Sequence, residues 1–205
     1  MTNNFLLRFL SALIIGPLII LIIYFGGNYF NLFLIFLLIL GLFEILMVKN
    51  KKVSLLIFLI FILFLYSCYQ LRSLPNGDSH LFLIIIITWL SDTGGYIFGK
   101  FFGKKKINFI SPNKTYAGFI GSIILSFTSF FYINFANLKF FASIILNFTF
   151  ILIASILVIL GDLLFSYFKR ESNIKDFSNF IPGHGGLFDR IDGMIVLTII
   201  YYLFN

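Results

Sequence analysis

Residues 166–192 read SYFKRESNIKDFSNFIPGHGGLFDRID and connect two long apolar segments of the chain. This connection holds four of the eight acidic residues of the chain and one of its two histidines. They are Glu171, Asp176, Asp189, Asp192 and His184. A chain with so few polar residues is expected to fold around the connection that concentrates them, and to carry its function there.

The composition places the chain in a membrane. Of its 205 residues 60% are hydrophobic and 11% are charged, and the mean hydropathy is +1.04. Soluble domains are only about 45–50% apolar, and this chain has too few charges to cover a water-facing surface. The single cysteine, Cys68, excludes a disulfide within the chain and is interpreted as a small buried hydrophobic residue.

Seven apolar runs are long enough, at about 1.5 Å per residue, to cross about 30 Å of hydrocarbon. The first run is too long for a signal peptide, contains Pro17 and is followed by no small-residue cleavage site, so we expect it to remain as a span. We predict an all-α polytopic membrane protein: one domain over residues 1–205, with residues 1–75 as a lipid-contacting scaffold and residues 81–205 as catalytic helices. The expected spans are Leu6–Phe25, Tyr29–Val48, Val53–Tyr69, Leu81–Phe98, Tyr116–Phe135, Phe140–Phe168 and Gly186–Phe204.

The basic residues predict the orientation. With the N-terminus and every second connection on the cytoplasmic side, thirteen of the 15 Lys and Arg residues lie on that side. Only Arg72 and Lys139 lie on the other side. This asymmetry is typical of the positive-inside rule and supports a count of seven spans. For Lys49, Lys51 and Lys52 topology alone is a sufficient explanation, although such loops also bind anionic lipid.

Four aspartates lie inside the predicted spans, near their cytoplasmic ends: Asp92, Asp162, Asp189 and Asp192. Ionisable residues at such depth are costly and are candidates for function. We expect carboxylates from three helices to meet on the order of 8–12 Å below the cytoplasmic boundary, with the last two on one helix face. Such hard oxygen ligands suit Mg²⁺ or Mn²⁺ better than zinc. The predicted fold therefore includes a polar metal-binding pocket open to the cytoplasm.

A structural alternative stays open for these aspartates, which can also pair with Lys169, Arg170 or Arg190 as salt bridges between helices. A similar choice applies to Ser166, which follows Asp162 by four residues and can complete a metal shell or bond to its own helix. Glu44, at the end of the second span, is interpreted as a side chain that reaches toward the membrane surface.

Two Gly- or Pro-containing segments precede predicted helices and are candidates for phosphate binding. In the first, residues 182–186 (PGHGG), we expect unpaired backbone N–H groups and the positive end of a helix dipole to face the pocket, with His184 as a phosphate or acid–base residue. In the second, Ser111 is the expected N-cap and Pro112 the first helical residue.

Gly95, Gly99 and Gly103 suit close helix packing as well as binding. The basic residues that can reach phosphates are Lys114, Lys169, Arg170, Lys175 and Arg190.

The long connection resembles the signature of the phosphatidate cytidylyltransferase (CDP-diacylglycerol synthase) family, with every fixed position filled. The matching positions are Ser166, Phe168, Lys169, Arg170, Lys175, Asp176, Ser178, Ile181, Pro182, His184, Gly185, Gly186, Leu187, Asp189, Arg190, Ile191 and Asp192. Upstream, residues 89–99 (WLSDTGGYIFG), 110–118 (ISPNKTYAG) and 161–163 (GDL) are similar to other blocks of the family. Ala117 stands where the family usually has an acidic residue. The resemblance covers about the C-terminal 120 residues.

This resemblance implies transfer of the cytidylyl group of CTP to phosphatidate, giving CDP-diacylglycerol and pyrophosphate, with Mg²⁺ and with room for a second cation. The expected catalytic residues are Asp162, Asp189, Asp192, Lys169, Arg170 and His184. The expected substrate-binding residues are Lys114, Ser111, Thr115, Lys175, Asp176, Gly185, Gly186 and Arg190. The expected metal ligands are Asp162, Asp189, Asp192, Asp92 and Ser166.

We further expect a homodimer in a bacterial cytoplasmic membrane, with the N-terminus and active site on the cytoplasmic side, membrane lipid as a partner and no nucleic acid. Two other functions use similar parts. A CTP-dependent polyprenol kinase, or another lipid nucleotidyltransferase, needs the same phosphate and metal groups. An ion transporter also uses intramembrane carboxylates, but spreads them across the membrane and gives no role to the glycine–histidine segment.

Overall fold

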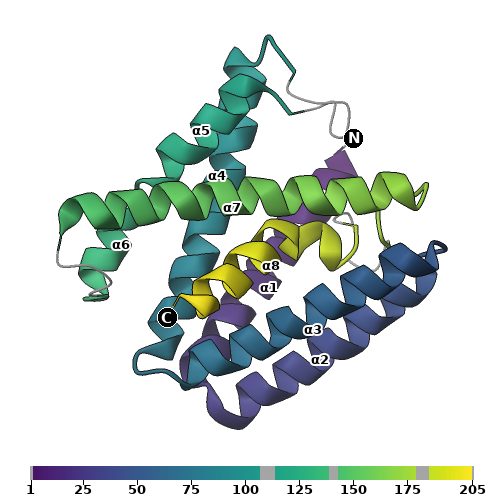
Figure 1. Cartoon of the computed structure of the whole chain (residues 1–205), viewed down its shortest axis with the longest axis horizontal. Coiled ribbons are helices and arrows are strands. Elements are labelled where there is room, and N and C mark those ends of the chain that lie inside the picture. Colours follow the sequence, from purple (N-terminus) through teal and green to yellow (C-terminus); the bar gives the residue numbers. More distant parts are fainter. Residues whose placement is uncertain (1, 107–113, 139–142, 179–184, 205) are drawn as a thin grey trace.

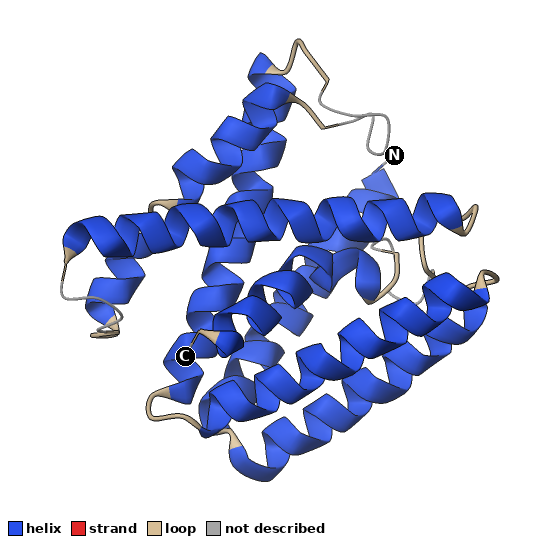
Figure 2. Ribbon diagram, viewed as in Figure 1, coloured by secondary structure: helices blue, strands red, loops and turns tan. Residues whose placement is uncertain are grey.

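A computed structural model of the chain describes residues 2–106, 114–138, 143–178 and 185–204. Within these residues the chain forms α-helices joined by short connections, and no strand (Figure 2). The helices are α1 (Thr2–Phe25), α2 (Gly27–Met47), α3 (Lys51–Ser73), α4 (Gly77–Phe102), α5 (Tyr116–Ser126), α6 (Ser129–Phe135), α7 (Ile144–Glu171) and α8 (Phe188–Leu203).

The predicted spans coincide with these helices, and α5 and α6 together form the fifth. Five segments of the described chain are long and apolar enough to cross a membrane: Gly27–Met47, Lys51–Ser73, Gly77–Phe102, Tyr116–Phe135 and Ile144–Glu171. Two predicted spans are too short to meet this criterion. The described apolar part of α1 is limited to Leu13–Phe25, and α8 has 16 residues. The all-α membrane fold is thus confirmed, with five spans that satisfy both length and composition.

The turn between α1 and α2 is fixed by a glycine and a distant arginine. Gly26 has a φ of +61°, in the region that side chains other than glycine's rarely adopt, and a Cβ there would overlap the guanidinium of Arg72. That guanidinium donates from Nε to the carbonyl of Ile23 at 3.0 Å and from Nη2 to the carbonyl of Tyr24 at 3.3 Å. Arg72 therefore satisfies carbonyl groups that the end of α1 leaves without helical partners.

Helices α4 and α5 form the closest helix pair because glycines line their interface. A Cβ at Gly94 would overlap the carbonyl of Gly121 on the other helix. Gly95, Gly99 and Gly103 also face α5 or its N-cap, since a Cβ at each would lie at 3.3 Å or less from a side-chain atom there. The spacing of these glycines on α4 thus serves close helix packing.

Helix α8 packs between α7 and α3, while α2 and α3 lie side by side as a hairpin (Figure 1). Phe188, the first residue of α8, is fully buried. Its ring lies 5.0 Å from that of Phe61 on α3, 5.8 Å from that of Phe165 on α7 and 5.4 Å from that of Phe177 in the α7–α8 connection. This aromatic cluster anchors the start of α8, which carries the acidic end of the connection.

Candidate active site

Three carboxylates on three helices lie near enough to influence one another's charge. Asp92 lies on α4, Asp162 on α7 and Asp192 on α8. The negative charge of Asp162 repels the carboxylates of Asp92 and Asp192, and these two carboxylates also repel each other. Asp92 is exposed and the other two are half-buried.

Basic side chains face this acidic group. Lys114 forms a salt bridge from Nζ to Oδ2 of Asp162, and Lys114 and Arg190 both act favourably on the charge of Asp92. Ser166 donates from Oγ to Oδ1 of Asp162 at 3.5 Å, at the limit of a hydrogen bond. The Ser166 hydroxyl thus points to the carboxylate of Asp162.

Asp189 is placed differently from the other aspartates. Its Oδ1 accepts from Nζ of Lys169 at 2.8 Å, and its Oδ2 accepts from the backbone N–H groups of Phe177 and Gly186, both at 3.0 Å. The side chain is only 7% exposed, against 16% for Lys169. The predicted alternative of a salt bridge with Lys169 is therefore observed, and Asp189 also ties together the two ends of the α7–α8 connection.

The N-terminus of α8 differs from the prediction. Unpaired backbone N–H groups were expected here, but that of Gly186 donates to Asp189, and those of Leu187 and Phe188 donate to Glu44 at 2.5 and 3.0 Å. The expectation of free donors is wrong for these three residues, because protein carboxylates already occupy the positions predicted for a phosphate.

The interpretation of Glu44 as a surface-seeking side chain is also wrong. Glu44 is 3% exposed and accepts from Oγ of Ser178 at 2.7 Å as well as from the two α8 amides. Sequence reasoning missed this role, although the signal was present. A carboxylate in an otherwise apolar span meets the same criterion that singled out Asp92.

Most of the other predicted residues lie at the protein surface or outside the described residues. Arg170, Lys175, Asp176 and Arg190 are exposed, and Gly185 has a φ of +84° next to the carboxylate of Asp189. The predicted cap at Ser111 is not the cap of α5. That helix begins at Tyr116, and Thr115 caps it by accepting from the N–H of Gly118 at 3.1 Å. Ser111 and His184 lie outside the described residues.

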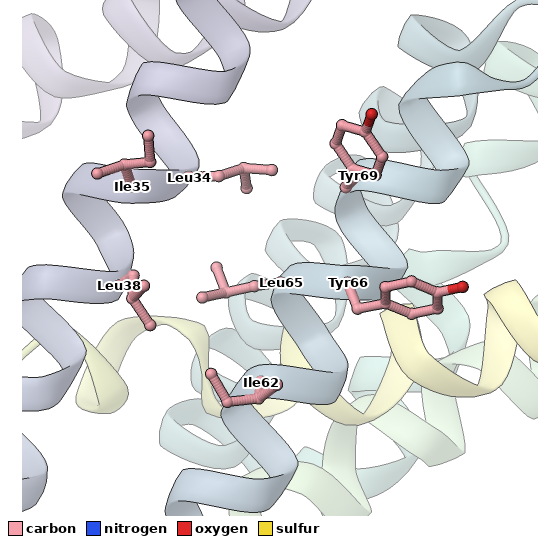
Figure 3. Close-up of a pocket in the computed structure, with 7 residues that line it drawn as sticks. All are labelled: Leu34, Ile35, Leu38, Ile62, Leu65, Tyr66 and Tyr69. Carbon is pink, nitrogen blue, oxygen red and sulfur yellow. The ribbon is translucent and has the colours of Figure 1, made fainter.

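An apolar groove lies between the middle of α2 and the second half of α3 (Figure 3). Its walls are Leu34, Ile35, Leu38, Ile62, Leu65, Tyr66 and Tyr69. It has no charged group to receive a nucleotide or a metal ion, so the acidic and basic residues described above form the candidate active site.

The model of the cytidylyltransferase family matches residues 48–205. The chain belongs to this family. It is 40% identical over 141 residues to the phosphatidate cytidylyltransferase of Staphylococcus haemolyticus and 42% identical over 141 residues to that of Staphylococcus aureus (strain COL), in each case over 66% of this chain and 52% of the relative. The corresponding protein of Haemophilus influenzae is 41% identical over 118 residues, which cover 56% of this chain and 41% of the relative. The chain spans about half the length of the curated relatives it matches.

The magnesium site predicted from the sequence is not formed by the described residues. Asp92, Asp162 and Asp192 offer hard carboxylate oxygens from three helices, and their mutual repulsion is what a cation relieves. Among the described residues, no three such side chains are already arranged around one point. Lys114 and Lys169 instead supply positive charge to Asp162 and Asp189.

Proposed function

We propose that this chain transfers the cytidylyl group of CTP to phosphatidate, giving CDP-diacylglycerol and pyrophosphate. The main support for the proposal is that carboxylates on α4, α7 and α8 interact electrostatically with one another and with Lys114 and Arg190, in a helical fold of the cytidylyltransferase family. The names of the relatives at about 40% identity support the lipid substrate.

The chemistry needs no nucleophilic side chain. The phosphate monoester of phosphatidate supplies an anionic oxygen, which attacks the α-phosphorus of CTP in line with the leaving group. The new bond joins this oxygen to the α-phosphorus, and the bond from the α-phosphorus to the bridging oxygen breaks to release pyrophosphate. The protein must therefore align the two phosphates and neutralise their charge.

The basic side chains take the phosphate oxygens in this proposal. Lys114 and Lys169 each lie beside an aspartate, which holds the flexible lysine near the substrate before it binds. Arg170, Lys175 and Arg190 are exposed and are available to the ends of the triphosphate and to the lipid phosphate. Because the α8 amides of Gly186, Leu187 and Phe188 are already bonded, side chains rather than this helix end bind the phosphates.

The carboxylates would hold the metal. Asp92, Asp162 and Asp192, with Ser166 next to Asp162, would bind one or two Mg²⁺ ions, and Asp189 remains a proposed ligand through Oδ1. When bound, Mg²⁺ neutralises charge on the triphosphate and on the pyrophosphate that leaves. The aspartates also keep Lys114 and Lys169 oriented, whether or not the ion is present.

We also propose that α1 and α8 complete the seven membrane crossings, that the acidic group faces the cytoplasm, and that the protein is a homodimer of a bacterial cytoplasmic membrane. The basic asymmetry of the loops supports the sidedness. A cytoplasmic opening admits CTP, and phosphatidate reaches the same end from within the membrane.

Labelled CTP distinguishes the candidate functions. Purified protein is incubated with phosphatidate, Mg²⁺ and CTP that carries ³²P at either the α- or the γ-phosphate, and the lipid is extracted. Cytidylyl transfer places the α-label, and none of the γ-label, in the lipid. Transfer of the γ-label to a polyprenol would indicate the kinase. Ion flux in proteoliposomes without CTP consumption would indicate a transporter, which the collection of the carboxylates at one end disfavours.

A further inference from the structure

Glu44 connects a helix outside the region matched by the family model to the start of α8, inside that region. The family match begins at residue 48, whereas Glu44 lies on the last turn of α2. Its side chain nevertheless reaches the α7–α8 connection and accepts three hydrogen bonds there. The donors are the hydroxyl of Ser178 at 2.7 Å and the backbone N–H groups of Leu187 at 2.5 Å and Phe188 at 3.0 Å.

The charge of Glu44 is balanced without a cation among the residues that the structure describes. The salt bridges found there join Lys114 to Asp162 and Lys169 to Asp189. Glu44 instead lies at the N-terminus of α8, where unsatisfied N–H groups and the helix dipole favour a negative charge. A buried carboxylate is costly unless it accepts hydrogen bonds. Moving α8 away from Glu44 would break the bonds from the amides of Leu187 and Phe188, so Glu44 stabilises the observed position of α8.

Two carboxylates bind both ends of the connection. Asp189 accepts from the N–H groups of Phe177 and Gly186, and Glu44 accepts from their neighbours Ser178 and Leu187. The two carboxylates therefore fix the start of α8 against both α7 and α2. The position of Asp192, one turn further along α8, depends on this start.

Gly186 shows how closely Glu44 approaches. A Cβ at Gly186 would lie 2.7 and 2.8 Å from the two carboxylate oxygens of Glu44 and 3.0 Å from its Cδ. These distances are shorter than ordinary contacts, so a side chain there would push the carboxylate away from the α8 amides. The glycine that sequence analysis assigned to phosphate binding thus makes room for Glu44.

We infer that Glu44 is a positioning residue for the transfer reaction, which holds the first turn of α8 so that Asp189, Arg190 and Asp192 face the substrates. This inference rests on the proposed cytidylyl transfer. Glu44 does not touch the reacting groups; it acts through the backbone of Leu187 and Phe188. Misplacement of catalytic groups by about 1 Å costs on the order of 100-fold in rate.

The test compares Glu44→Gln with Glu171→Gln, an identical change at an exposed site at the end of α7. Steady-state kcat and KM for CTP and phosphatidate are measured on monodisperse protein, together with hydrogen exchange of the α8 amides. For Glu44→Gln we expect kcat to fall about 100-fold while KM for CTP changes less than about threefold, with faster exchange at Leu187 and Phe188. Glu171→Gln should match the wild type.

Two milder variants keep the test informative where Glu44→Gln does not fold. Ser178→Ala removes one of the three donors and leaves no backbone N–H unpaired, so kcat should fall about three- to tenfold. Glu44→Asp keeps the charge on a shorter side chain, and its kcat should lie between those of the wild type and Glu44→Gln. A purely structural role would lower the unfolding temperature of these variants and leave kcat per folded protein unchanged.

The outcomes separate this inference from the proposed function. A wild-type protein that transfers no α-label overturns the proposed function itself. An active wild type whose Glu44→Gln and Ser178→Ala variants both retain wild-type kcat overturns only the positioning role. A rise in KM without loss of kcat also overturns it, because Glu44 would then act on substrate binding.

Discussion

Replacing Asp189 by Asn changes almost no volume but removes the charge that faces Lys169. In the structure Asp189 accepts one bond from the ammonium at 2.8 Å and two from backbone N–H groups at 3.0 Å. An Asn side chain has one acceptor oxygen and one NH₂ group. If its oxygen keeps the two backbone bonds, the NH₂ group faces the ammonium of Lys169, and the charge-assisted bond is lost.

The structure sets the size of the effect on stability. A hydrogen bond to a charged group contributes about 1.5–3 kcal/mol, and breaking a fully buried pair costs about 3–5 kcal/mol. The side chains of Asp189 and Lys169 are 7% and 16% exposed, so solvent relieves a small part of this cost. We expect Asp189→Asn to lose about 2–3 kcal/mol, which lowers the unfolding temperature by about 5–10 °C in a chain of this size.

Asp189→Asn should lower the turnover number as well as the free energy of unfolding. Asp189→Asn is expected to insert and fold, and to lose at least about 100-fold in turnover, the range seen when one preorganised electrostatic contact is removed. The assay is incorporation of α-labelled cytidylate into lipid, paired with thermal unfolding of the same sample. Asp78→Asn, in the first turn of α4 at the end opposite Asp92, is the control and should stay within about twofold of the wild type.

A double-mutant cycle shows whether the two side chains act as a pair. Lys169→Met combined with Asp189→Asn should cost less stability than the sum of the single changes, with a coupling of about 1.5–3 kcal/mol. Wild-type turnover of purified Asp189→Asn, or additive effects in the cycle, would refute the reasoning.

Other consequences concern separate parts of the molecule. Lys114→Met should lower kcat/KM for CTP about 10–100-fold, because the mutation removes the ammonium group that Asp162 and the phosphates share. Unchanged steady-state kinetics would contradict this role. Gly94→Ala should destabilise the protein by about 1–3 kcal/mol in thermal unfolding. Gly16→Ala, whose new Cβ would lie 4.0 Å from the ring of Trp89, should be neutral or gain up to about 1 kcal/mol. Arg72→Met should cost about 1–3 kcal/mol by freeing two carbonyl groups at the end of α1, and equal turnover per folded protein is expected. Chelation by EDTA should abolish transfer, and Mg²⁺ or Mn²⁺ rather than Zn²⁺ should restore it in the labelled-CTP assay.

The positions of the helices followed from the sequence. Apolar runs long enough to cross hydrocarbon can satisfy their backbone only as helices, so run length located the helices. The alternation of these helices brought the ends that carry Asp92, Asp162 and Asp192 to one side. Their charges interact in the structure, but they do not form a metal-binding group among the described residues.

Periodicity and spacing did not identify hydrogen-bond partners. The glycine-rich segment before α8 has the composition of a phosphate-binding turn, yet its amides at Gly186, Leu187 and Phe188 bind Asp189 and Glu44. Composition describes which groups a segment offers, whereas the partner of each group depends on which side chains neighbouring helices bring within about 3 Å.

The sequence by itself determined the membrane-embedded helices and the resemblance to a cytidylyltransferase. Only the tertiary structure decided that Glu44, 134 residues before Ser178 in the chain, meets it and the start of α8. The physical reason is that hydrophobic burial along a helix depends on local composition, whereas a buried carboxylate finds its donors only after α2, α7 and α8 have packed together.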